Sequence, residues 1–262
     1  MITDAASSRS PAAIAATEAV VDRLTPQTRP HERVVGYQRW QSTLLLHWAL
    51  PPHVLRRHLP KRLSLDTFGG EAFVSFVLFT VVGARLKPLP PLPGLNTFHE
   101  VNVRTYVHLG GRQPGLWFLS LDATNAIACA LARASLRLPY FFARMKRERD
   151  RDEHRFTSHR IGARRRPADL QVSWRSTGPL LEAPAGSLEH FLAQRFFLYS
   201  PGAGSKLIRQ QVHYAPWPLF SAELQDFRQS LDEAQDLPFL SKRPLAHASP
   251  GVSVEFFPPH LV

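Results

Sequence analysis

Residues 98–142 constrain the fold most, because a strand, a glycine-rich turn, a second strand and a helix follow one another there. In the first strand, one set of alternate positions is polar: Glu100, Asn102, Arg104 and Tyr106. Because side chains alternate across a strand, these four share one face and lie about 7 Å apart along it. If that face looks into a cavity, it is a binding site. Taken alone, the pattern favours a solvated face, since antiparallel sheets commonly expose one side to water.

Short apolar runs separated by glycine and proline recur along the chain and predict a β-rich architecture. We expect strands near residues 34–46, 71–82, 98–107, 116–121, 142–148, 154–161, 170–175, 207–214 and 251–257. We expect helices near 14–24, 53–59, 123–137 and 188–196, and one from Ser221 to about 231. Asp122 and Asn125 are good caps for the helix at 123–137, and the four prolines of 86–95 predict a loop over one end of the fold. The predicted class is α+β, mainly β, with a large antiparallel sheet or closed barrel and a few flanking helices.

Composition indicates one globular domain. The chain has 262 residues, of which 44% are apolar, enough for one substantial core. Residues 1–30 are rich in Ala, Ser and Pro and are expected to be a flexible extension, dispensable for folding, before a domain at 31–262. No apolar run reaches 18 residues, so we expect no membrane-spanning helix. The N-terminus lacks a secretory signal, and the single cysteine, Cys129, suits a reducing cytoplasm.

The net charge of +11 raises the question of a polyanion partner. Residues 144–166 hold ten Lys and Arg against four acids, and their pattern predicts a charged hairpin. No helix-turn-helix, zinc-finger or aromatic RNA-binding signature accompanies this segment. A solvated hairpin is therefore the favoured interpretation, nucleic acid is not an expected partner, and polyanion binding is the weaker alternative.

Several blocks of the sequence resemble a known family. They are TLLLHWALPPHVLRRHLPKRLSLDTFGGEAFVSF, PLPGLNTFHEVNVRTYV, GLWFLSLDA, LPYFFARM, GSLEHFLAQRFFLYS and QVHYAPWPLF. In this order they are similar to the uncharacterised bacterial YqjF-like proteins, a domain of unknown function in the acetoacetate-decarboxylase-like superfamily. The resemblance spans residues 31–262 and implies a closed or nearly closed barrel with a central cavity. It names no reaction, because the family has none assigned.

Acetoacetate decarboxylase works through a Schiff-base lysine in a Pro-Lys-Lys motif after a helix. The corresponding segment here is Leu138-Pro139-Tyr140-Phe141, so an aromatic pair stands where the resemblance implies lysines. A phenol cannot form an imine with a carbonyl substrate. Among the five lysines, Lys146 is the only candidate to replace the Schiff-base lysine. We therefore expect no Schiff base.

The resemblance also implies cavity residues. Glu100 matches an acid of the decarboxylase cavity and is, with Tyr140, a candidate catalytic residue, because burial would raise its pKa. The arginine of the decarboxylase's first core strand has no match, since His47-Trp48-Ala49 stands there. The candidate ligand-binding residues are Arg104, Asn102, Tyr106, His47, Trp48 and Trp117.

No histidine or cysteine pattern has the spacing of a metal site, so we expect neither a metal nor another cofactor. The leading hypothesis is a cytoplasmic barrel that binds a small organic carboxylate or carbonyl compound, with acid–base (lyase or isomerase) activity that needs no Schiff base. The alternative is a non-catalytic ligand-binding or regulatory protein, since fold does not fix function. The sequence leaves a homo-oligomer open.

Overall fold

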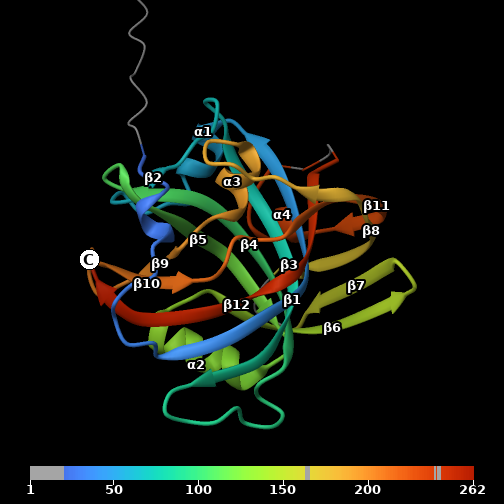
Figure 1. Ribbon diagram of the computed structural model, residues 1–262, viewed down its shortest axis with the longest axis horizontal. Coiled ribbons are helices and arrows are strands. Elements are labelled where there is room, and N and C mark those ends of the chain that lie inside the picture. The colour runs from blue at the N-terminus through green and yellow to red at the C-terminus, as the bar shows by residue number, and fades with distance from the viewer. Residues whose placement is uncertain (1–20, 163–165, 239, 241–242) are drawn as a thin grey trace, which may run out of the picture.

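The computed structural model describes residues 21–162, 166–238, 240 and 243–262 (Figure 1). Its helices are the 3-10 helix η1 (Thr25–Gln27), α1 (Pro52–Arg56), α2 (Ala126–Leu136), α3 (Leu188–Ala193) and α4 (Leu231–Ala234). Its strands are β1 (Gly36–Leu50), β2 (Ser64–Leu65), β3 (Ala72–Leu86), β4 (Phe98–Leu109), β5 (Arg112–Ala123), β6 (Tyr140–Asp150), β7 (Glu153–Arg160), β8 (Asp169–Leu181), β9 (Phe197–Pro201), β10 (Leu207–His213), β11 (Leu219–Gln229) and β12 (Leu245–Leu261). The helix expected at 14–24 falls mostly outside the described residues.

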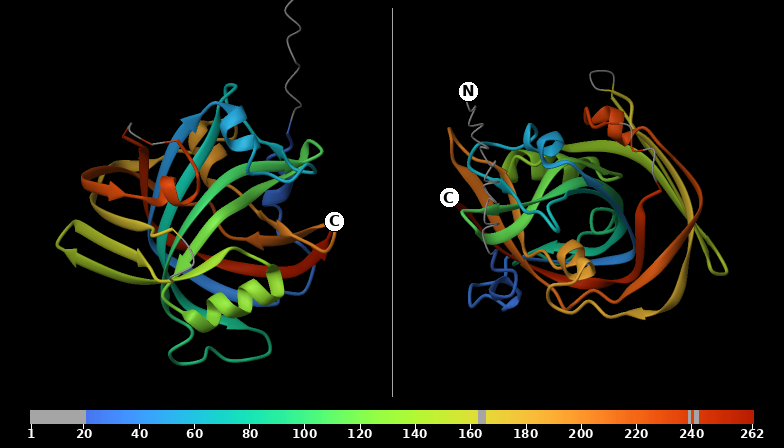
Figure 2. Two further views of the ribbon diagram at one scale, coloured as in Figure 1. Left: turned by 180° about the vertical axis from the view of Figure 1, so that it is seen from behind. Right: turned by 90° about the horizontal axis from the view of Figure 1, so that it is seen from above.

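All the described strands belong to one 12-stranded sheet that closes into a barrel. Strands β12, β1, β3, β4, β5, β9 and β10 pair in that order, and β10 pairs back with β12. The right-hand view of Figure 2 looks into this ring. Most pairs are antiparallel, but β5 pairs in parallel with both β6 and β9. The expected mainly-β barrel with a few helices is thus confirmed.

A second layer covers one side of the barrel. Strands β6, β7, β8 and β11 continue from β5 back to β12 and lie outside β1, β3 and β4 (Figure 1). Val101 and Val103 therefore pack in a core shared with Phe156 and Trp174 of this layer. Since β4 is buried on both faces, the solvated face that its alternation alone favoured is wrong.

Two expected helices differ in the structure. Helix α2 begins at Ala126, where the Asn125 side chain accepts a hydrogen bond from the Ala128 backbone N–H at 3.0 Å. Asp122 does not cap it. The segment expected to be a helix after Ser221 is strand β11, paired with β8. Its alternating exposure fits a strand with one face on the core, so sheet pairing overrode the capping signal.

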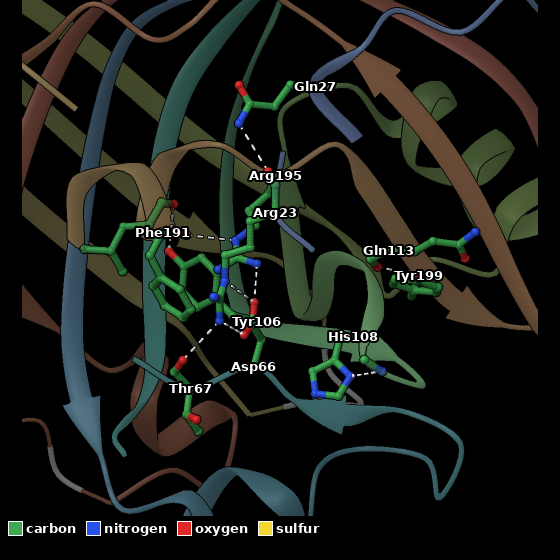
Figure 3. A network of polar contacts seen from close by, with 12 residues as sticks. Arg23, Gln27, Asp66, Thr67, Tyr106, His108, Gln113, Phe191, Arg195 and Tyr199 are labelled. Atoms are coloured by element: carbon green, nitrogen blue, oxygen red, sulfur yellow. Dashed lines mark hydrogen bonds and ion pairs between the residues drawn. The ribbon is translucent and has the colours of Figure 1, made fainter. Parts of the chain in front are cut away.

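One buried ion pair connects the loop after β2 to the segment after α3. Arg195 and Asp66 are 2% and 1% exposed, and the Arg195 guanidinium also donates to the Phe191 carbonyl at 2.8 Å (Figure 3). Arg23 binds the same Asp66 carboxylate. Residues 21–30, assigned to the extension from sequence, thus contact the barrel here and through the buried Pro26. Within the described chain, no helix combines the length and apolar character needed to cross a membrane.

Candidate functional site

The barrel interior holds a cavity of about 370 Å³. Strands β3, β4 and β5 supply one wall, and helix α2 with the loop between β3 and β4 lies over one end (Figure 1). Most lining side chains are apolar. The polar ones on the barrel wall include Glu100, Asn102 and Arg104 from β4, Tyr140 from β6 and Gln210 from β10. Three of the four polar residues on the predicted face of β4 therefore line one cavity.

Glu100 and Tyr140 form a hydrogen-bonded pair in this cavity. The Tyr140 hydroxyl donates to Glu100 Oε2 at 2.9 Å. Pairing of β4 with β5 and of β5 with β6 brings the two residues together, since Ala123 lies beside Glu100 and Leu121 beside Tyr140. Burial raises the pKa of Glu100 to about 7, although the hydrogen bond from Tyr140 opposes the rise. Burial and the neighbouring carboxylate raise the pKa of Tyr140 well above its usual value, so its hydroxyl stays protonated.

Arg104 is a buried cation without a counter-charge among the described residues. It is 7% exposed, no described carboxylate pairs with it, and its Nε has no described hydrogen-bond partner. Asn102 Oδ1 is likewise unpartnered in the described part of the chain. Glu100 lies four residues from Arg104 along the strand, about 13 Å between Cα atoms, and no ion pair joins them. A buried guanidinium of this kind is suited to a carboxylate, which it binds with two parallel hydrogen bonds.

Two other candidates lie deeper in the barrel and do not line this cavity. His47 Nδ1 lies 2.6 Å from Ser75 Oγ, which lies 2.8 Å from the Tyr106 hydroxyl. The Tyr106 hydroxyl also donates to the Leu192 carbonyl at 3.0 Å. Burial lowers the pKa of His47 well below its usual value, so the imidazole is neutral. These side chains form a hydrogen-bonded cluster directly beside Arg104, because Ser75 is its cross-strand neighbour.

The two tryptophan candidates lie on other faces of their strands. Trp48 packs against Phe76 and Phe227, with ring centroids 4.8 and 5.9 Å away, in the core outside the barrel. Trp117 packs with Tyr199 and its neighbours on the face of β5 opposite to the cavity-lining Phe118. Neither is among the residues that line the cavity.

Sequence analysis missed several cavity residues from the other wall. Gln210 lines the cavity while its amide donates to the Phe257 carbonyl at 3.0 Å, and Trp40 and Trp217 stack 6.0 Å apart. Gln210 stands in an expected strand, but a single polar residue there gave no reason to place it inside. Its position depends on the pairing of β10 with β9 and β12, which no local pattern reveals.

The cavity contains no lysine among the described residues. Lys61, Lys87, Lys146 and Lys206 are all exposed, and Lys242 lies outside the described residues. The described chain also contains no cluster of three or more His, Cys, Asp or Glu that could hold a metal ion. The polar groups described above are an acid, a phenol, two amides and a guanidinium, which can bind an anion and transfer protons. Tyr37, Gln38, Arg85 and Ser135 line the cavity as well.

Comparison with solved structures defines the fold class. The barrel is similar to an acetoacetate-decarboxylase-like enzyme from Sphingomonas wittichii RW1, with a TM-score of 0.60 at 13% identity over 88% of this chain and 93% of the other. It is also similar to the enduracididine biosynthesis enzyme MppR complexed with pyruvate, with a TM-score of 0.60 at 14% identity over 87% and 91% of the two chains. At such identities the likeness establishes the fold alone. The protein therefore has an acetoacetate-decarboxylase-like barrel fold.

Sequence comparison identifies the family. Residues 37–253 match DUF2071, a family described as an uncharacterised conserved protein. The chain is 34% identical to the uncharacterised protein YqjF of Bacillus subtilis (strain 168) over 221 residues, which cover 84% of this chain and 90% of the relative. The chain belongs to this family, as the sequence blocks had indicated.

Proposed function

We propose that this protein binds a small organic carboxylate in its barrel cavity and performs acid–base chemistry on it without a Schiff base. The observation that carries the proposal is Arg104, a buried guanidinium without a described counter-charge in the same cavity as the Glu100–Tyr140 pair. The pyruvate complex of a barrel with the same fold supports a carboxylate as the ligand class. A cytoplasmic location is part of the proposal and is supported by the single, buried Cys129.

Each polar group has a distinct role in the proposed chemistry. Arg104 holds the carboxylate, and Asn102 supplies a further polar contact. Glu100, with a pKa of about 7, removes a proton from the carbon next to a substrate carbonyl and returns it later. Once Glu100 carries that proton, it is neutral and accepts the Tyr140 hydrogen bond less strongly. The Tyr140 hydroxyl is then free to donate to the enolate oxygen, the group that carries the developing charge.

The absence of a cavity lysine among the described residues supports a non-covalent mechanism. Borohydride trapping with pyruvate or acetoacetate, read by intact mass, tests this directly. We expect no adduct. A stable adduct on a single lysine, lost when that lysine is replaced, would contradict the mechanism and restore imine chemistry.

Ligand binding is tested by calorimetric titration with pyruvate and hexanoate. The Arg104→Gln variant should bind at least about tenfold more weakly, because it loses a charge-assisted bidentate contact. The control is Arg144→Gln, an exposed arginine on β6, which should bind like the wild type. Equal affinity in both variants would place the anion elsewhere and remove the proposal.

Catalysis is tested separately by hydrogen–deuterium exchange at the carbon next to the carbonyl of pyruvate and 2-oxohexanoate, followed by NMR. The wild type should accelerate exchange, and Glu100→Gln should lose about a hundredfold or more of that acceleration. Arg104-dependent binding without any exchange would favour the non-catalytic alternative, a ligand-binding or regulatory protein.

The polyanion alternative finds less support in the basic segment at 144–166. Arg160 is buried against Asp122, with Nε to Oδ1 at 2.8 Å, and Arg147 Nη1 reaches the Ser42 carbonyl at 2.7 Å. Two of its cations are therefore directed into the fold, and Lys146 pairs with Glu148 on the surface. Titration of DNA binding with salt tests this polyanion alternative, and a lack of affinity at low salt would remove it.

A further inference from the structure

The opening of the cavity is unusually apolar for a surface. Five large hydrophobic side chains that line the cavity are also 45–63% exposed: Leu86, Leu89 and Leu92 next to or within the loop between β3 and β4, and Ile127 and Leu131 on α2. We call these five residues the rim. The loop and the helix are tied together, since the Asn125 amide donates to the Leu95 carbonyl at 3.1 Å. The rim is thus one continuous border to which both elements contribute.

The polar groups lie progressively deeper than the rim. Phe98, at the start of β4, follows the rim loop, and Glu100, Asn102 and Arg104 succeed it along the same strand. At about 3.3 Å per residue, some 20 Å of strand separates Arg104 from Phe98. A molecule whose carboxylate reaches Arg104 must therefore extend past Glu100 to touch the rim. An acid of two to four carbons cannot contact both ends.

The cavity volume gives the size of the molecule. At about 30 Å³ for each water-sized group, a cavity of about 370 Å³ accommodates about a dozen non-hydrogen atoms. Decanoate has that number. Apolar residues also line the cavity at the level of the polar groups: Val77 and Phe79 of β3 lie cross-strand from Asn102 and Glu100. Together with Trp217 they can contact a hydrocarbon chain and offer little to a polar one.

From this arrangement we propose that the ligands are amphipathic monocarboxylates with an apolar tail of about eight to ten carbons. This inference rests on the proposed function: the carboxylate binds Arg104, the chain runs past Glu100, and the tail ends against the rim. Binding covers apolar side chains that water otherwise surrounds, and that burial provides much of the affinity.

The test is calorimetric titration with butanoate, hexanoate, octanoate, decanoate and dodecanoate, each below its micelle-forming concentration. We expect the dissociation constant to fall about fourfold for each added methylene up to about decanoate and then to level off. An affinity independent of chain length, with butanoate binding still dependent on Arg104, would overturn this inference and leave the proposed function intact. If none of the acids binds, the proposed function itself fails.

A matched pair of variants locates the tail. Leu131, on the rim, and Leu180, on β8, are 59% and 56% exposed, so serine at either position should be tolerated by the fold. Leu131→Ser should weaken decanoate about fivefold and leave butanoate within twofold, whereas Leu180→Ser should change neither. Equal effects of the two substitutions on decanoate would show that the tail does not use the rim and refute the proposal.

Decanol separates the head group from the tail. It should bind at least about tenfold more weakly than decanoate, because it lacks the charge that Arg104 recognises. Equal affinities would refute the carboxylate assignment while supporting an apolar ligand.

Discussion

The raised pKa of Glu100 has a measurable effect on stability. A carboxyl with a pKa of about 7 in the folded protein and 4.5 in the unfolded chain binds its proton more tightly when folded. Well below pH 4.5 both states are protonated and the group has no effect. As the pH rises toward 7, the unfolded chain ionises first, and the folded state becomes progressively less stable relative to it. The full loss corresponds to about 2.5 pKa units, or about 3 kcal/mol.

The Glu100→Gln variant removes this ionisation while keeping an oxygen that can accept the Tyr140 hydrogen bond. Subtracting wild-type from variant unfolding free energies cancels the other titrating groups, including the buried histidines. From the two pKa values, we expect the difference in unfolding free energy to increase by about 2–3 kcal/mol in favour of the variant between pH 5 and pH 8. Most of that change should occur below pH 7.

The assay is urea unfolding at four pH values across this range, followed by tryptophan fluorescence. Glu148→Gln is the control. Glu148 is exposed, and its hydrogen bond from Lys146 lowers its pKa, so it remains ionised throughout. The difference for this control should be constant with pH. If the difference in unfolding free energy for Glu100→Gln is also constant with pH, Glu100 ionises at an ordinary pKa. The argument for its role as a base would then be lost.

Three further perturbations test the structure. Replacing Arg104 by Met should raise the melting temperature by about 2–4 °C, a gain of about 1 kcal/mol, because a buried charge without a described partner is removed; a clear loss would indicate an unrecognised partner. Asp122→Ala should cost about 3–5 kcal/mol by leaving the Arg160 guanidinium buried and unpaired, and near-wild-type urea unfolding would argue against that pair. A chain lacking residues 1–30 should be about 1–2 kcal/mol less stable than one lacking 1–20, because only the longer deletion removes the Arg23 contact with Asp66; equal melting temperatures would support the dispensable extension expected from sequence.

Local patterns in the sequence were sufficient for most of the strands, for the family and for part of the site, but not for β2, β9 and β11. Period-two alternation alone placed Glu100, Asn102 and Arg104 on one face, since side chains of a strand must alternate. The replacement of the lysine pair by Tyr140 and Phe141 pointed to chemistry without an imine. In each case the signal lies within a few neighbouring residues, so it can be read without knowing how distant parts of the chain pack.

Tertiary structure decided what those faces meet. Whether the polar face of β4 looked into water or into a cavity depended on the closure of β10 onto β12, a pairing of segments about 50 residues apart. Pairing with β8 made the segment after Ser221 strand β11. Tyr106 shares a face with Arg104 but bonds to Ser75 and Leu192 and does not line the cavity. Alternation assigns a side chain to one face of a strand, but only the packing of distant strands determines what covers that face. Burial of the polar face of β4 raises the pKa of Glu100 and leaves Arg104 buried without a described counter-charge.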